Sequence, residues 1–283
     1  MFRYTKSMIK RGILFLCAAT VPHFGLAASF GNLMLLGDSM TGGAGSAPYA
    51  YRQDLAIQFV AGNHSFTNVG PLSEGQFPAV PSVESRHAGF GGWSTAMLLN
   101  GNGNPNNKLS NWLTTYSPNT IVWSSGHNDI WDILFNTADW NETAIYNFNT
   151  IVVPRFRQTV QTIFNYNSST KLVIAAPAKM LPNGTTYRLP YSQAMRNALS
   201  DISTEWSTNG YDVTFVDWWT ATSEVPGVHF GPDNVHWNAA GANLAANLVY
   251  DGLNAVPEPS TLLLLGVPAL ALAKRRSRAK GQK

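Results

Sequence analysis

The side chains best suited to chemistry are a serine, an asparagine, an aspartate and a histidine, and they are widely separated in the chain. Ser39 ends the stretch "NLMLLGDS", Asn128 stands in "SSGHNDI", and Asp233 and His236 stand in "GPDNVHWN". A serine hydroxyl becomes a nucleophile when a histidine accepts its proton, and an aspartate can hold that histidine in the required tautomer. An asparagine amide can stabilise negative charge that develops on a substrate oxygen. Brought together, these residues could catalyse acyl transfer.

Each of these signals is weak when taken alone. Gly, Asp and Ser are common turn residues, so Gly37-Asp38-Ser39 could simply end a strand. Asn128 and Asp129 could simply cap the helix expected from Ile130. The evidence lies in the positions of these residues relative to the elements around them, because each follows an expected strand.

Five apolar stretches predict strands, and they alternate with stretches that predict helices. The strands are expected at 32–39, 64–70, 119–126, 171–177 and 212–218, and the helices at 48–61, 107–116, 143–166, 191–208 and 239–252. Ile121-Val122-Trp123 is apolar throughout, as in strands buried on both faces. Pro154 predicts a kink within 143–166. The alternation predicts one three-layer α/β/α sandwich with a mostly parallel sheet, in which ligands bind beyond the carboxyl ends of the strands.

Four blocks in this order resemble the SGNH, or GDSL-type, hydrolase family. They are Gly37-Asp38-Ser39, Gly92 in "HAGFGGWS", Gly126-His127-Asn128-Asp129 and Asp233-Asn234-Val235-His236. The resemblance covers residues 33–240 and implies a flavodoxin-like, five-stranded sheet and a serine esterase. His127 is a departure, since many members carry Thr or another small residue there.

Chemistry and the resemblance together assign a role to each candidate residue. His236 would take the Ser39 proton through Nε2, and Asp233 would accept a hydrogen bond from Nδ1. The resemblance implies three donors to the oxyanion: the backbone N–H groups of Ser39 and Gly92 and the side-chain amide of Asn128. We expect no cofactor and no metal, because Asp233 and His236 are only two ligands.

Other residues near the motifs have simpler interpretations. His87 and His229 could line the cleft, but loop histidines held by the backbone are the more common case. Asp129 is expected to hold its loop rather than to act as an acid. Trp93 and Trp237 flank motif positions, which leaves open whether they contact substrate.

Both ends of the chain predict export. Residues 1–28 contain basic residues, the apolar stretch "GILFLCAATV" with the sole cysteine, Cys17, and the small residues of "GLAAS". This pattern predicts a signal peptide cleaved after Ala27 or Ala28, with an uncleaved membrane anchor as the alternative. Residues 256–283 contain "PEPST", a short apolar run and a basic cluster, which resemble the PEP-CTERM sorting signal. That resemblance implies recognition by an exosortase-type membrane enzyme of a Gram-negative bacterium.

The expected catalytic domain, residues 29–255, is acidic. It carries nine basic and fifteen acidic residues, so the basic balance of the whole chain belongs to the two ends. The composition therefore gives no indication of nucleic-acid binding. Contact with a membrane is expected only transiently, through the termini.

The sequence as a whole predicts an exported serine esterase that removes short acyl groups, with acetyl preferred, from a carbohydrate such as an acetylated polysaccharide. The expected location is the periplasm, the cell surface or the extracellular matrix. The motifs look closer to carbohydrate acetylesterases than to long-chain lipases. An O-acyltransferase or a lipase of the same fold is one alternative. A non-catalytic surface protein that binds carbohydrate is another.

Overall fold

A central parallel sheet organises the chain. A computed structural model describes residues 27–45, 47–133, 140–181 and 188–255, so residues 1–26 of the expected signal peptide at 1–28 and the whole expected tail at 256–283 lie outside the described residues. Five strands form the sheet in the order β2-β1-β6-β7-β8, all parallel, and a short β5 also pairs with β1. Their bounds are Ser29–Gly37 (β1), Ser65–Val69 (β2), Ala88–Gly89 (β5), Thr120–Ser124 (β6), Lys171–Ala175 (β7) and Val213–Val216 (β8).

Alternate residues of each strand face opposite layers of the core. In β1, Met34 and Leu36 belong to one hydrophobic cluster, whereas Leu33 and Leu35 belong to the other. Strands β6 and β7 divide in the same way. Successive side chains of a strand point to opposite faces, so a strand covered on both sides must be apolar at every position. This requirement explains the uninterrupted apolar runs in the sequence.

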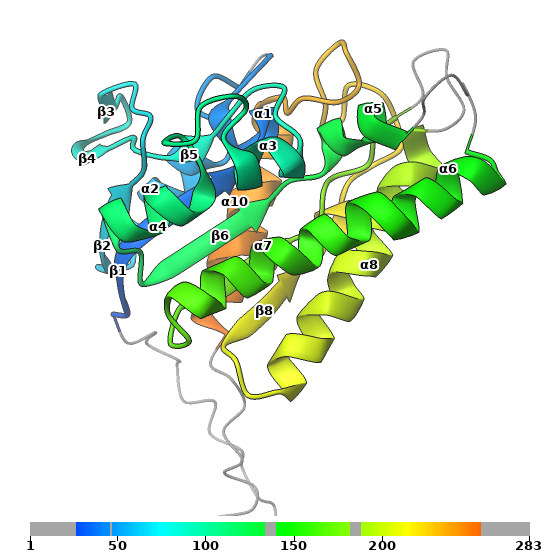
Figure 1. The fold of residues 1–283 in the computed structure, drawn as a ribbon. Coiled ribbons are helices and arrows are strands. Elements are labelled where there is room, and N and C mark those ends of the chain that lie inside the picture. Colours follow the sequence, from blue (N-terminus) through cyan, green and yellow to red (C-terminus); the bar gives the residue numbers. More distant parts are fainter. Residues whose placement is uncertain (1–26, 46, 134–139, 182–187, 256–283) are drawn as a thin grey trace, which may run out of the picture.

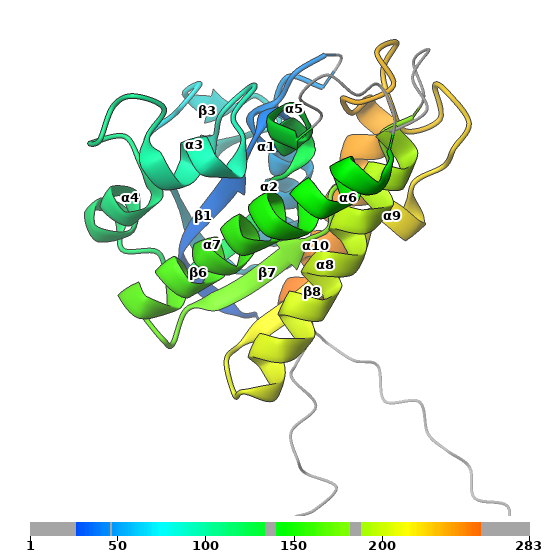
Figure 2. The ribbon, with the colours of Figure 1, turned by 45° about the vertical axis from the view of Figure 1, so that its right-hand side comes forward.

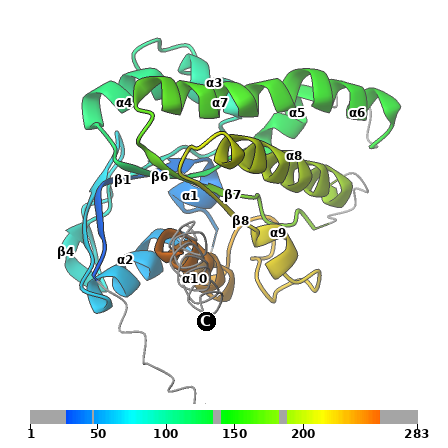
Figure 3. The same ribbon diagram turned by 90° about the horizontal axis from the view of Figure 1, so that it is seen from below.

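Helices cover both faces of the sheet, as Figure 3 shows from below. One face carries α3 (Thr95–Asn100), α4 (Leu109–Tyr116), α7 (Val153–Tyr166) and α8 (Arg188–Thr208), and the other carries α2 (Arg52–Ala61) and α10 (Ala239–Asn254). Figure 2 shows α7 and α8 in front of β7 and β8. The predicted three-layer α/β/α architecture is confirmed. None of the described helices is long and apolar enough to cross a membrane.

The predicted helix at 143–166 is divided rather than simply kinked. It consists of α6 (Glu142–Asn147), a π-helical turn (Phe148–Val152) and α7, which has Pro154 in its first turn. Proline has no backbone N–H, so it cannot continue the regular ladder of hydrogen bonds. The wider turn before Pro154 accommodates that missing donor. The helix expected at 48–61 likewise begins only at Arg52.

Several short elements carry no periodicity and were not predicted. They are the hairpin of β3 (Gln76–Phe77) and β4 (Val80–Glu84), the helices α1 (Ser39–Gly42) and α9 (Trp218–Ala221), and the 3-10 turn at His127–Asp129, whereas the helix expected from Ile130 is present as α5 (Ile130–Ile133). Many of these elements lie beyond the carboxyl ends of the strands, at the top of Figure 1. The sheet order reverses between β1 and β6, since β2 lies on one side of β1 and the later strands lie on the other. A ligand site is expected at this reversal.

The close approach of β1 to β6 at this edge depends on Gly37. A Cβ at this position would lie 2.1 Å from the Ser124 carbonyl oxygen and 2.5 Å from Thr41 Oγ1. We predict that Gly37→Ala lowers the free energy of unfolding by about 2–3 kcal/mol or more, because the added methyl group meets backbone that cannot move aside. Urea denaturation measures this loss. Gly91→Ala is the control, since its Cβ would have no neighbour within 4 Å. Equal stability of the two variants would contradict the prediction.

Candidate active site

Ser39 is presented by a sharp turn from β1 into α1. Strand β1 ends at Gly37, and Ser39 is the first residue of α1. Asp38 caps this helix, because its Oδ1 accepts a hydrogen bond of 2.9 Å from the backbone N–H of Met40. The Asp38 side chain is fully buried and Ser39 is half-buried. The turn therefore holds the Ser39 hydroxyl at the end of a central strand, with its backbone N–H at the start of a helix.

The structure brings Ser39, His236 and Asp233 into one hydrogen-bonded row. His236 Nε2 lies 2.8 Å from Ser39 Oγ, and His236 Nδ1 lies 2.6 Å from Asp233 Oδ2. The other carboxylate oxygen, Asp233 Oδ1, accepts hydrogen bonds from the backbone N–H groups of Val235 and His236. This geometry lets the imidazole accept the serine proton while the carboxylate holds the opposite ring nitrogen.

The environment keeps the Asp233 carboxylate ionised. Partial burial raises the pKa of Asp233, but the hydrogen bonds from the His236 ring and from the backbone N–H groups outweigh it, so this pKa lies below its usual range. An ionised carboxylate is the form that stabilises a protonated histidine ring. Both residues come from one loop just before α10, so the pair is held locally.

Gly92 and Asn128 lie on two neighbouring loops that meet. The Asn128 side-chain amide donates a hydrogen bond of 3.1 Å to the Trp93 carbonyl oxygen, which fixes its orientation next to Gly92. Gly92 has a φ of +77°, and a Cβ there would meet no atom within 4 Å. The positive φ favours glycine, and the residue is exposed to solvent. The loop of Gly92 and the amide of Asn128 thus border the same edge of the sheet as Ser39.

An aromatic stack supports the Gly92 loop from one side. The rings of Trp93 and Phe90 stack at 4.2 Å between centroids, and Phe90 stacks in turn on Trp112 at 5.0 Å. The Phe90 N–H also donates to the Gly37 carbonyl oxygen, which joins the loop to the end of β1. Stacked aromatic rings contribute beyond the area that they bury, so the loop is held rigidly.

Asp129 holds the same region together from beneath, as predicted. Its Oδ2 accepts hydrogen bonds from the backbone N–H and the hydroxyl of Thr95, and its Oδ1 accepts one from Arg155. Burial raises the pKa of Asp129 to about 6, although the Thr95 hydrogen bonds and Arg155 act to lower it. These contacts join the Asn128 turn to the start of α3. Both oxygens of the Asp129 carboxylate are therefore engaged in contacts that hold the Asn128 turn in place.

A second polar network supports the β5 side of the loop, and most of it was not predicted from the sequence. Buried Arg52 donates to the carbonyl oxygens of Gly42 and Ser85 and pairs with Glu74 at 3.2 Å. His87 Nε2 lies 2.9 Å from Glu74 Oε1, and His87 Nδ1 accepts from the Gly89 N–H. The network ties α1 to β5 across more than thirty residues of sequence. Such long-range pairings leave no local signal.

The remaining candidates are accounted for by local contacts. His87 belongs to the network just described, and His229 Nδ1 accepts a hydrogen bond from the Ser223 N–H. Trp237 is only 1% exposed and stacks on Phe230, so it does not reach substrate. Trp93 is half-buried beside Gly92. Within the described ranges, no three His, Cys, Asp or Glu side chains are grouped closely enough to hold a metal ion.

Two models of known protein families match the chain. The family model of the GDSL-like lipase/acylhydrolase family matches residues 35–244, and that of the PEP-CTERM protein-sorting motif matches residues 255–278. The sorting motif indicates export and sorting in Gram-negative bacteria. By sequence, no protein of curated function matches the chain significantly.

Similar solved structures share the fold. A family 3 carbohydrate esterase from Clostridium thermocellum is 20% identical and superposes with a TM-score of 0.57, covering 79% of this chain and 94% of its own. A family 3 carbohydrate esterase from Talaromyces cellulolyticus gives 19% identity, a TM-score of 0.58 and coverages of 78% and 95%. Axe2, an acetylxylan esterase from Geobacillus stearothermophilus, is 15% identical and superposes with a TM-score of 0.52, covering 80% of this chain and 95% of its own. At identities of 15–20%, this structural similarity shows that the chain shares the α/β fold of these proteins.

His87 makes the stability of the fold sensitive to acid. Burial, together with the charge of Arg52, lowers the pKa of His87 to about 4, against the opposing effect of Glu74. The unfolded chain therefore binds a proton that the folded chain excludes between about pH 6.5 and 4, and stability is lost as the pH falls through this range. We predict that wild type loses up to about 3 kcal/mol more than His87→Gln between pH 7 and pH 4.

Urea denaturation of both proteins at several pH values provides the measurement. The comparison with His87→Gln is needed because Asp129, whose pKa is raised, acts in the opposite direction over part of this range. Parallel pH profiles for the two proteins would show that His87 does not titrate as described.

Proposed function

The chain belongs to the GDSL-like lipase/acylhydrolase family, and we propose that it is an exported serine esterase that removes short acyl groups, acetyl above all, from a carbohydrate. The observation that carries the proposal is the row of Ser39, His236 and Asp233, with contacts of 2.8 and 2.6 Å. The proposal assigns Ser39 as the nucleophile, His236 as the general base and acid, and Asp233 as the residue that orients His236.

The first half of the reaction forms an acyl-enzyme. Ser39 Oγ attacks the ester carbonyl carbon while its proton passes to His236 Nε2, and Asp233 stabilises the charged ring. The tetrahedral intermediate then breaks its bond to the alcohol oxygen. The leaving alcohol takes the proton from His236, and the acyl group stays on Ser39.

Water completes the cycle by the reverse sequence of proton transfers. It attacks the acyl-enzyme while His236 accepts a proton, and the bond to Ser39 Oγ breaks as the proton returns to the serine. The products are a carboxylic acid and the free enzyme.

In both halves, the negative charge on the former carbonyl oxygen is bound by three N–H donors. These are the backbone N–H groups of Ser39 and Gly92 and the side-chain amide of Asn128. Preorganised donors of this kind cost no rearrangement when the charge develops. The hydrogen bond from Asn128 to Trp93 supports this assignment, because it uses one amide hydrogen and leaves the other available.

Two observations support a carbohydrate as the substrate and acetyl as the acyl group. The similar structures include carbohydrate esterases and an acetylxylan esterase. The sorting motif at 255–278 is consistent with a cell-surface or extracellular place of action, where a polysaccharide substrate would be accessible. In this proposal, an exosortase-type enzyme processes the tail, and residues 29–255 act as the catalytic domain.

We predict that Ser39→Ala lowers the rate of hydrolysis of p-nitrophenyl acetate by roughly 10⁴-fold or more, because the nucleophile is lost. A series of p-nitrophenyl esters from acetyl to decanoyl is used with the purified protein, and the rate is expected to fall with chain length. Equal rates for wild type and variant would exclude the mechanism. A rate that rises with chain length would instead identify a lipase, and transfer of acetyl to an added sugar would identify a transacylase.

We predict that Asn128→Ala lowers kcat about a hundredfold or more with little change in KM, since one oxyanion donor contributes about 2.7–4 kcal/mol to the transition state. Steady-state kinetics on the preferred ester measure both constants. Asn247→Ala, on the exposed surface of α10, is the matched control. A kcat equal to that of the control would show that Asn128 does not bind the oxyanion.

A further inference from the structure

His127 occupies a buried position between the nucleophile turn and the oxyanion amide. Its side chain is 4% exposed, and it directly precedes Asn128. Its Nδ1 faces Asp38 Oδ2 at 3.5 Å, and its Nε2 lies 3.3 Å from the Ala178 carbonyl oxygen. Asp38 in turn caps the helix that begins with Ser39. The His127 ring follows β6 in the chain, and it thus contacts Asp38, which follows β1, and Ala178, which follows β7.

The two contacts together favour a ring that carries a proton on each nitrogen. The Ala178 carbonyl oxygen is an acceptor, so Nε2 must carry a proton to bind it. In a neutral ring, the Nδ1 lone pair would then point towards the Asp38 carboxylate, which is repulsive. A second proton, on Nδ1, turns this repulsion into an ion pair. Neither Asp38 Oδ2 nor His127 Nδ1 has a hydrogen-bond partner among the described residues. Each of these two buried atoms is therefore compensated electrostatically by the other, which lies 3.5 Å away.

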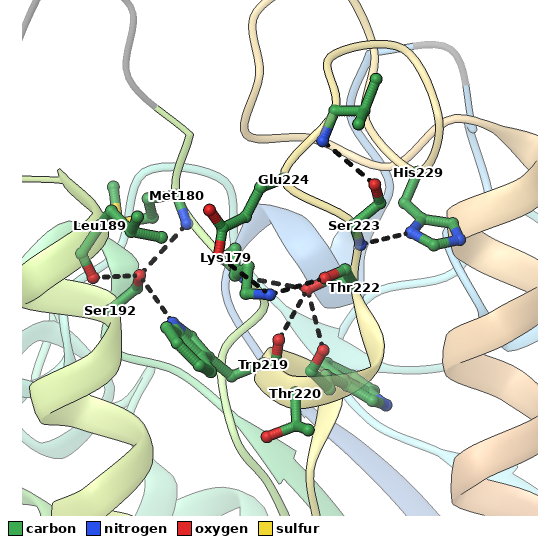
Figure 4. Close-up of polar contacts among 12 residues, drawn as sticks. Lys179, Met180, Leu189, Ser192, Trp219, Thr220, Thr222, Ser223, Glu224 and His229 are labelled. Carbon is green, nitrogen blue, oxygen red and sulfur yellow. Dashed lines mark hydrogen bonds and ion pairs between the residues drawn. The ribbon is translucent and has the colours of Figure 1, made fainter.

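Ala178, whose carbonyl oxygen contacts His127, directly precedes Lys179. The contacts of Lys179 are shown in Figure 4 and hold this segment in place. The Lys179 ammonium group donates to the Thr222 carbonyl oxygen at 2.9 Å, pairs with Glu224 at 3.4 Å and lies 4.6 Å from the centre of the Trp219 ring. Two residues further along the chain, the Leu181 N–H donates to the Asn234 carbonyl oxygen in the loop of Asp233 and His236. The Ala178 carbonyl is therefore fixed relative to the catalytic loop.

The charge of this pair matters for the reaction. Asp38 is fully buried and directly precedes Ser39, whose backbone N–H is one of the proposed oxyanion donors. An uncompensated negative charge there opposes a second negative charge, most strongly in a site that excludes water. A cationic His127 cancels it and also fixes the backbone that leads into Asn128.

We propose that His127 is a positioning residue of the ester hydrolysis: a buried imidazolium that neutralises Asp38 and aligns Ser39, Asn128 and the β7 loop. This inference rests on the proposed function for its kinetic effect, although the protonation state of the ring can be measured without turnover.

The first test is a long-range ¹H–¹⁵N NMR spectrum of the ¹⁵N-labelled wild-type protein at pH 7, with the His127 signals assigned through His127→Asn. Both ring nitrogens are expected to be protonated. A signal typical of an unprotonated Nδ1 would overturn the proposal whether or not the protein is an esterase. This measurement on the wild type stands even if a variant does not fold.

The second test is kinetic and uses a double variant. His127→Asn keeps a donor towards Asp38 but carries no charge, and it is expected to lower kcat roughly tenfold with KM little changed. Asp38→Asn combined with His127→Asn removes both charges while keeping an oxygen to cap α1, and kcat is expected to recover most of this loss. His229→Asn is the control that leaves activity unchanged.

Each kinetic outcome has a defined meaning. No loss in His127→Asn, or a loss that the double variant does not recover, would contradict the charge-neutralising role. Absence of ester turnover in the wild type, or an equal rate in Ser39→Ala, would instead overturn the proposed function. In that case the NMR spectrum still decides whether the ion pair exists.

Discussion

The close pairing of β1 and β6 at their carboxyl ends is the constraint on which the rest of the structure depends. Gly37 lies opposite Ser124 in this pair, and the space for a side chain at that position is already filled by the Ser124 carbonyl and Thr41. The sheet order reverses between these two strands, so the chain segments that leave them diverge and form the walls of a site. Ser39 follows one strand and Asn128 follows the other.

The candidate catalytic residues lie in loops and short helical turns, and polar or aromatic networks hold these segments in place. Arg52, Glu74 and His87 join α1 to β5 on one side, whereas Thr95, Asp129 and Arg155 join the Asn128 turn to α3 and α7 on the other. Buried ion pairs add little net stability, but removing one partner is costly, so they hold one arrangement in preference to others. Rigidity of this kind suits a site whose donors must be in place before the charge develops.

The main strands, the three-layer architecture and the meeting of Ser39 with Asp233 and His236 were all predictable. Strands buried on both faces need continuous apolar runs, and the order of the motifs along the chain places each residue after a strand. The break before Pro154 and the hairpin of β3 and β4 were not predicted, since elements of two to five residues carry no periodic signal. The buried Arg52 network and the contact of His127 with Asp38 were missed for another reason: an arginine in a helix is normally exposed, and nothing local shows that it is not.

The fold class and the family were therefore predictable from the sequence, as was the meeting of Ser39, His236 and Asp233, because these depend on local patterns of polarity and on the order of short motifs. Which charged side chains are buried, and which of them face one another, became evident only from the folded arrangement. Trp237 illustrates the difference, since it adjoins His236 in the chain yet packs against Phe230 in the core. The physical reason is that burial and charge compensation depend on what packs against a residue from distant parts of the chain, and that information is absent from any local stretch.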